Sequence, residues 1–113
     1  MNFEVVMTSQ AARAIRAAYR WWASRRSPDQ ASRWYNRFVR AINRLSSKPN
    51  RYSLSAEAAD FPFDIRDLLF GIGTRPTHRA VFTIRGSKVI VFTIRHVAQD
   101  ALSPEDVEFP ADG

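Results

Sequence analysis

A group of basic side chains stands where a predicted β-hairpin begins and ends. The stretch from His78 to His96 contains two similar apolar runs separated by Gly86-Ser87, a pair typical of a type II′ two-residue turn. Such a turn brings Arg79, Arg95 and His96 to the same open end of the hairpin. The planar guanidinium of arginine binds carboxylates and phosphates, and the imidazole of histidine transfers protons near neutral pH. This end is therefore the candidate site, either for binding an anion or for acid–base chemistry.

The hairpin turn also predicts the register of its two strands. The run Val81–Arg85 recurs as Val91–Arg95, and a two-residue turn sets cross-strand neighbours by simple alternation. The expected pairs are Arg85 with Lys88, Ile84 with Val89, Phe82 with Val91 and Ala80 with Thr93. The second strand is apolar on both sides, which is typical of an interior strand.

Composition indicates one soluble domain with an anionic partner. The 113 residues carry 17 Lys and Arg against 11 Asp and Glu, for a net charge of +6. We expect a single domain over 1–113 and a partner that is either nucleic acid or an acidic protein segment. With no cysteine and two histidines, we expect no metal and no cofactor. No leader-like start and no long apolar run are seen, so we expect a cytoplasmic protein with no membrane contact.

Periodicity predicts the order β-α-α-β-β-β. A short strand over Phe3–Met7 precedes a helix capped by Thr8 or Ser9, and Ser27-Pro28 starts a second helix that ends by Lys48-Pro-Asn50. A loop runs to about Pro62, and Ile65–Phe70 forms a strand before the hairpin. The expected fold is α+β, with a helical hairpin packed on one face of a mainly antiparallel four-stranded sheet. We expect the opposite face to be partly open, a helical turn at Ser103–Asp106 and a flexible tail after about residue 103.

The helix surfaces offer further candidate contacts. Arginines recur along the second helix on one face, at positions 33, 37, 40 and 44. This stripe is either a solvated face or a partner contact. Trp21 stands beside Trp22, so both cannot point into one core. An exposed Trp21 is a candidate contact.

Three motifs follow one another in the second half of the chain. They are Thr77-His-Arg-Ala-Val-Phe-Thr-Ile84, the Gly86-Ser87 turn and Val91-Phe-Thr-Ile-Arg-His-Val-Ala-Gln-Asp100. Together with the element order, they resemble the RelE/ParE superfamily of toxins from bacterial type II toxin-antitoxin pairs. The resemblance implies a growth inhibitor neutralised by a cognate antitoxin, and hence a hetero-oligomer. RelE-like members cut messenger RNA on the ribosome, whereas ParE-like members poison DNA gyrase.

The resemblance to RelE-like members implies a metal-independent endoribonuclease with Arg79, His96 and Arg66 as catalytic residues. Arg79 would stabilise the transition-state phosphate, His96 would act as acid or base, and Arg66 or Arg95 would add a cation. The sequence departs from that pattern, because no lysine pair stands around residues 63–73 and Gln99 replaces a common arginine. The Arg95-His96 ending followed by Ala98 and Asp100 is closer to ParE-like members.

The preferred hypothesis is therefore a toxin that poisons DNA gyrase by binding. Its alternatives are a ribosome-dependent endoribonuclease acting on messenger RNA and a nontoxic binding module of the same fold. A plainer hypothesis for the hairpin end is that Arg79 and Arg95 form salt bridges with Asp64, Asp67 or Asp100. The residues proposed to contact the target or the antitoxin are Arg79, Arg85, Arg95, His96, Gln99, Asp100, Arg37, Arg40 and Trp21.

Overall fold

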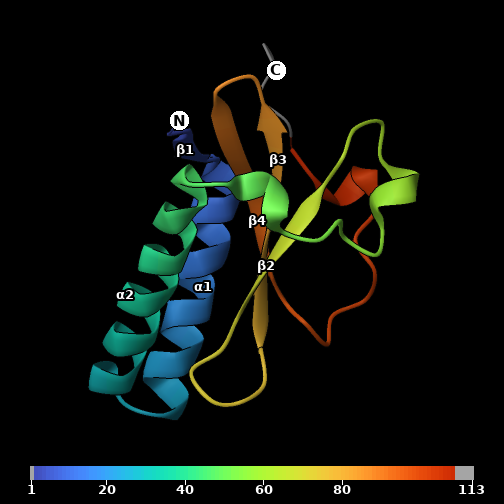
Figure 1. Ribbon diagram of the computed structural model, residues 1–113. Coiled ribbons are helices and arrows are strands. Elements are labelled where there is room, and N and C mark those ends of the chain that lie inside the picture. Colours follow the sequence, from blue (N-terminus) through green and yellow to red (C-terminus); the bar gives the residue numbers. More distant parts are fainter. Residues whose placement is uncertain (1, 109–113) are drawn as a thin grey trace.

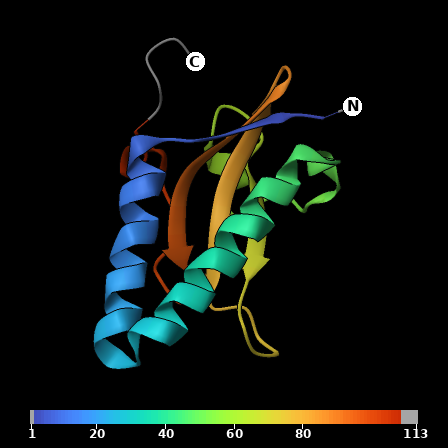
Figure 2. The ribbon, with the colours of Figure 1, turned by 90° about the vertical axis from the view of Figure 1, so that its left-hand side faces the viewer.

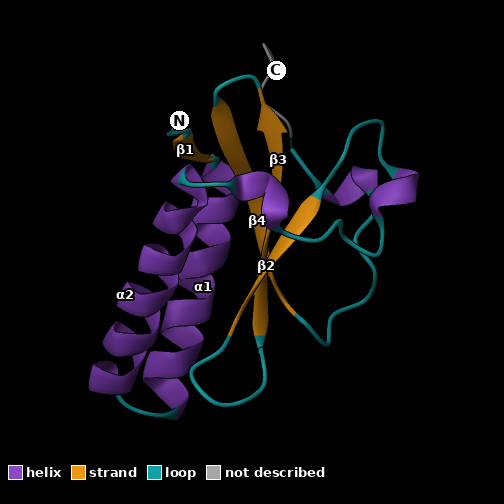
Figure 3. Cartoon of the chain, in the orientation of Figure 1, coloured by secondary structure: helices purple, strands orange, loops and turns teal. Residues whose placement is uncertain are grey.

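The computed structural model, which describes residues 2–108, has a helical hairpin on one side of a four-stranded sheet (Figure 1). The chain order is β1 (Glu4–Met7), α1 (Ser9–Arg25), α2 (Pro28–Asn43), β2 (Arg66–Phe70), β3 (His78–Arg85) and β4 (Lys88–His96). The predicted α+β class and element order are confirmed. Short 3-10 turns lie between α2 and β2 and after β4, and Figure 3 shows short helical turns in the helix colour outside the two long helices.

The sheet is mixed, with strand order β1-β4-β3-β2. β2 pairs with β3 and β3 with β4 in antiparallel fashion, whereas β1 runs parallel to β4. β4 is thus an interior strand, as its apolar residues on both sides predict. The parallel pair follows from the helical hairpin, which returns the chain to the same end of the sheet before β2 begins.

Side-chain caps define where the helices start. The Thr8 hydroxyl accepts a hydrogen bond from the Ala11 N–H, and the Ser27 hydroxyl accepts one from the Gln30 N–H. These bonds satisfy backbone donors that the first helical turn leaves unpaired. α2 ends at Asn43, earlier than predicted, but the following 3-10 turn still buries Leu45.

A β-bulge changes the register of the hairpin. The pairs Arg85–Lys88, Ile84–Val89 and Phe82–Val91 are as predicted, but the register shifts between Val81 and Phe82. The predicted pair of Ala80 with Thr93 is wrong, because Ala80 lies opposite Ile94. A one-residue shift moves the following side chains to the other face of the sheet. His96 therefore shares the helix side with His78, and Arg95 shares the far side with Arg79.

The main core lies between the sheet and the two helices, which cover one face of the sheet (Figure 2). Trp34 and Phe38 of α2 are fully buried against the sheet residues Phe82 and Val91. Ala11 and Ile15 of α1 are buried in the same core. The burial of large apolar groups at the helix–sheet contact is the dominant favourable term in such a domain.

A second core covers the opposite face of the sheet. It consists of Phe61, Ile65, Val81, Phe92, Leu102 and Val107. The loop before β2 and the segment after β4 supply its outer half, so the expectation of a partly open face is wrong.

The segment after β4 packs against the domain as far as the structure describes it. Pro104–Asp106 forms the expected helical turn, with a capping box between Ser103 and Asp106. Gln10 donates to the Asp106 carbonyl and Arg13 pairs with Glu108. The flexibility expected after about residue 103 stays a prediction for residues 109–113, which lie outside the described residues. Within residues 2–108, no helix is long and apolar enough to cross a membrane.

Candidate functional site

Arg79 lies in a buried cluster of charges on the far face of the sheet. Its guanidinium donates to Glu57 Oε1 at 3.0 Å and to Asp67 Oδ2 at 3.1 Å. The three side chains are only 11%, 9% and 17% exposed. The Arg79 hydrogen bond lowers the pKa of Glu57 to about 2 and, with Asp67, Glu57 raises that of Arg79. Glu57 and Arg79 are therefore charged at neutral pH.

The cluster joins three separate segments of the chain. Glu57 also accepts the Leu102 backbone N–H at 2.8 Å, and the Ser55 hydroxyl donates to Asp67. Two carboxylates face one guanidinium, so the cluster carries a net negative charge. It therefore repels a phosphate. The salt bridge expected between Arg79 and Asp67 is present, and Glu57 is its additional partner.

His96 stands on the other face of the sheet, beside His78, with ring centroids 5.1 Å apart. Its Nδ1 accepts the Ala98 backbone N–H at 3.0 Å, so neutral His96 carries its proton on Nε2. A proton added to Nδ1 would break that hydrogen bond. The structure thus presents His96 Nε2–H as a donor, and it does not bring this imidazole to Arg79.

His78 is buried beneath the helices. Its ring lies 5.0 Å from that of Trp34, and its Nδ1 lies 2.9 Å from the Thr77 hydroxyl oxygen. Burial, with a smaller effect of His96, lowers the pKa of His78 to about 4. It is therefore neutral at neutral pH.

Arg66 belongs neither to the Arg79 cluster nor to the His78–His96 pair. It pairs with Phe82 in the register, four positions along β3 from His78, which is roughly 13 Å along the strand. Its guanidinium donates to the backbone carbonyls of Tyr52 and Asn50. The structure therefore does not assemble Arg79, His96 and Arg66 into one site.

The residues after β4 form a tight turn. The Gln99 side chain accepts the His96 backbone N–H at 2.8 Å, and Arg95 donates to the Asp100 backbone carbonyl at 2.8 Å. The contact between Arg95 and Asp100 thus runs through the backbone and not through the carboxylate. Arg95, Gln99 and Asp100 thus lie together with His96 at the surface.

The other predicted contact residues are distributed over the surface. Arg85 lies at the hairpin turn with its guanidinium 5.7 Å from the Phe63 ring centre, at the opposite end of the hairpin from His96. Arg37 and Arg40 are exposed on α2. Trp21 is 50% exposed, which agrees with the expectation that Trp21 and Trp22 cannot both point into one core.

Sequence reasoning missed Glu57 and Leu102. Glu57 lies in a polar, alanine-rich loop without periodicity, and nothing in that stretch distinguishes it from an exposed carboxylate. Its partner Arg79 is 22 residues away, so no local spacing reveals the pair. Within the described residues, no group of three or more His, Cys, Asp or Glu side chains is placed to hold a metal.

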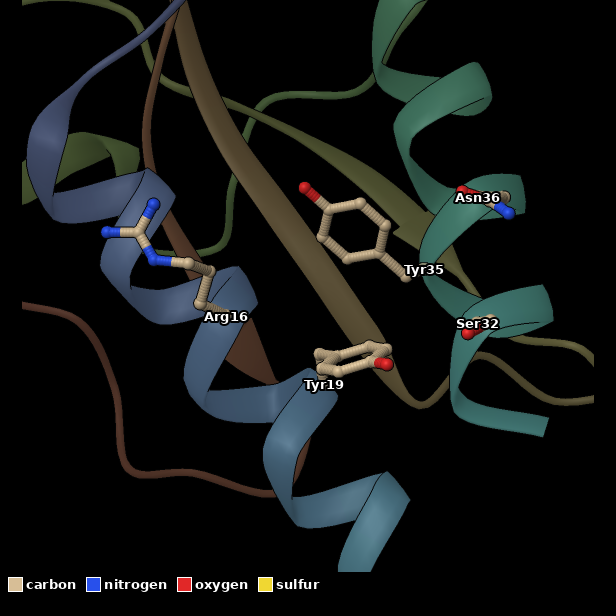
Figure 4. Close-up of a pocket in the computed structure, with 5 residues that line it drawn as sticks. All are labelled: Arg16, Tyr19, Ser32, Tyr35 and Asn36. Atoms are coloured by element: carbon tan, nitrogen blue, oxygen red, sulfur yellow. The ribbon is translucent and has the colours of Figure 1, made fainter. Parts of the chain in front are cut away.

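A shallow pocket of about 370 Å³ lies between the two helices (Figure 4). Arg16 and Tyr19 line it from α1, and Ser32, Tyr35 and Asn36 line it from α2. The two tyrosine rings meet edge to face with centroids 5.7 Å apart. The pocket lies away from both Arg79 and His96, so it adds nothing to the hairpin site.

The fold and the sequence together define a class of protein. Residues 5–101 match the family described as ParE toxin of type II toxin-antitoxin system, parDE. Because this match spans most of the chain, the protein belongs to the ParE toxin family. A solved structure described as "Chromosomal ParDE TA system from P. aeruginosa" is similar in fold, with a TM-score of 0.67 and 20% identity. The similarity covers 84% of this chain and 96% of that chain. The comparison with curated proteins gave no match.

Proposed function

We propose that this protein is a cytoplasmic type II toxin that poisons DNA gyrase by binding it, and that a cognate antitoxin neutralises it in a hetero-oligomeric complex. Membership of the ParE family supports the toxin class and the antitoxin partner. The arrangement of Arg79 carries the choice of a binding mechanism over RNA cleavage. Its charge is already paired with Glu57 and Asp67.

Cleavage of RNA through the 2′-hydroxyl needs a base, an acid and cations for the charged phosphate within reach of one another. Here Arg79 and His96 lie on opposite faces of the sheet, and Arg66 lies at a distance from both. His96 Nδ1 is engaged by Ala98, which leaves no free lone pair in the neutral ring to accept a proton. These three observations favour binding over catalysis.

The proposal is tested by expressing the chain from a tight inducible promoter, alone and with the antitoxin encoded by a neighbouring gene. We expect growth arrest with intact messages and a DNA-damage response, and rescue by the antitoxin. The purified protein should inhibit supercoiling by gyrase. Arrest with cut messages would instead support an endoribonuclease, and absence of arrest would support a nontoxic binding module.

Variants sharpen this test only where they leave the fold intact. His96→Ala alters an exposed side chain, so its loss of RNA cleavage would report chemistry. Under the proposal, messages stay intact in cells that express the parent and in cells that express His96→Ala, because neither protein cuts RNA. Arg79→Ala is a poor probe of mechanism, because it leaves two buried carboxylates unpaired and weakens the fold.

A further inference from the structure

We infer that the end of the helical hairpin next to the β2–β3 loop binds an acidic protein segment that inserts one bulky apolar side chain. The turn between α1 and α2 and the β2–β3 loop lie at the same end of the molecule (Figures 1 and 2). Two pockets at this end share Trp22, and we name the pair the Trp22 groove. The inference goes beyond the proposed function, because it requires no particular toxin target.

One side of the groove accepts an apolar group. This pocket of about 380 Å³ is lined by Ala18, Trp21, Trp22, Thr77, His78 and His96. Two of its few polar groups are already engaged, since the Thr77 hydroxyl contacts His78 Nδ1 and His96 Nδ1 accepts the Ala98 N–H. Apart from His96 Nε2–H, the pocket offers a nucleobase few partners, so most of the base's donors and acceptors would stay unpaired. An aliphatic or aromatic side chain has no such penalty.

The other side of the groove accepts an anion. This pocket of about 490 Å³ is lined by Trp22, Arg26, Arg33, Trp34, Arg37 and Ile72. None of its three arginines forms an ion pair with any described residue. The indole N–H groups of Trp22 and Trp34 are buried and have no hydrogen-bond partner among the described residues. Guanidinium groups without an ion-pair partner around one pocket are complementary to a carboxylate.

The two halves together specify the occupant. Trp21 is half exposed at the apolar pocket and has the Arg25 guanidinium 5.2 Å from its ring centre. Tryptophan and arginine are the residue types that contribute most to protein interfaces. An apolar anchor beside one or more carboxylates satisfies both halves at once, whereas a nucleic acid satisfies only the arginines.

The test uses the full-length protein as bait for a displayed library of random peptides. We expect enriched peptides to combine Asp or Glu with a bulky apolar residue. A synthetic peptide of the enriched sequence should bind about tenfold more weakly to Trp21→Ala and to Arg33→Glu/Arg37→Glu than to the parent. Leu54→Ala is the matched control for Trp21→Ala, because both side chains are 50% exposed. Arg44→Glu/Arg51→Glu is the control for charge, because it reverses two exposed arginines outside the groove, and neither control should change the affinity.

Three outcomes would overturn the inference. The first is a library that yields no enriched sequence. The second is an enriched peptide that binds Trp21→Ala and Arg33→Glu/Arg37→Glu as tightly as it binds the parent. The third is a single-stranded oligodeoxythymidine that binds more tightly than the peptide and loses affinity in the same variants. These measurements involve neither gyrase nor growth, so their failure is distinct from failure of the proposed function.

Discussion

At the scale of single residues, the buried Arg79 cluster is the feature that most changes how the sequence is understood. A basic side chain at the end of a hairpin suggests a site for an external anion. The structure supplies two internal anions, Glu57 and Asp67, and the first of these also holds the Leu102 N–H. The arginine thus stabilises the contact between the sheet and the segments that cover its far face.

We predict that Arg79→Met destabilises the protein by about 3–5 kcal/mol, because it leaves two buried carboxylates without a cation. The measurement is the free energy of unfolding from denaturant titration. Arg85→Met is the matched control, since Arg85 is an exposed arginine of the same hairpin whose guanidinium lies over the Phe63 ring and forms no ion pair with any described residue. The control should lose no more than about 1 kcal/mol. Equal losses in the two variants would contradict a structural role for the cluster.

A second residue-scale prediction concerns the hairpin turn. Gly86 has φ of 59° and Ser87 does not adopt a positive φ, which matches the type II′ turn predicted from the sequence. Gly86→Ala should cost about 1–2 kcal/mol, because an L-residue is strained in this conformation. Gly73→Ala is the control, since a Cβ there meets nothing within 4 Å and its φ is not positive. If Gly73→Ala lowers the thermal midpoint as much as Gly86→Ala, the turn conformation is not the cause.

At the scale of elements, local signals explain what the sequence could predict. The caps at Thr8 and Ser27 and the turn at Gly86 depend on near neighbours, so helix starts and the first hairpin pairs are predictable. The register shift between Val81 and Phe82 is not, because the alternation of the two apolar runs contains no residue that marks it. The same holds for the candidate site. The adjacency of Trp21 and Trp22 predicts that they do not both point into the core, whereas the pairing of Arg79 with Glu57 requires the folded loop.

The segment after β4 is a structural element in its own right, and its anchor is Leu102. Leu102 is 2% exposed in the second core and its backbone N–H bonds to Glu57. We predict that Leu102→Ala costs about 2–5 kcal/mol through lost burial and the resulting cavity. The measurement is again denaturant unfolding, with Leu69→Ala as the control because Leu69 is 55% exposed. An unchanged midpoint in Leu102→Ala would mean that this segment does not stabilise the sheet.

At the scale of the whole molecule, two buried groups make stability depend on pH. The pKa of His78 falls from 6.5 to about 4 on folding, and that of Glu57 falls from 4.5 to about 2. For each group, the unfolded chain binds more protons than the folded protein at any pH between the group's folded and unfolded pKa values. Stability therefore decreases as pH falls through each of these two pH windows. The His78 window lies above the Glu57 window, and the two produce successive losses on acidification.

We therefore predict a loss of as much as about 3 kcal/mol between neutral pH and pH 4 from His78 alone, because 2.5 pKa units correspond to that free energy. The measurement is the free energy of unfolding by denaturant across this range. His78→Phe keeps a ring against Trp34 and removes the titrating group, so its stability should be nearly independent of pH from 6.5 to about 4.5. Its stability should decrease below that, where Glu57 takes up a proton in the unfolded chain but not yet in the folded one. If the variant loses stability in the upper window as steeply as the parent, another group is responsible and the buried imidazole is not what makes folding sensitive to acid.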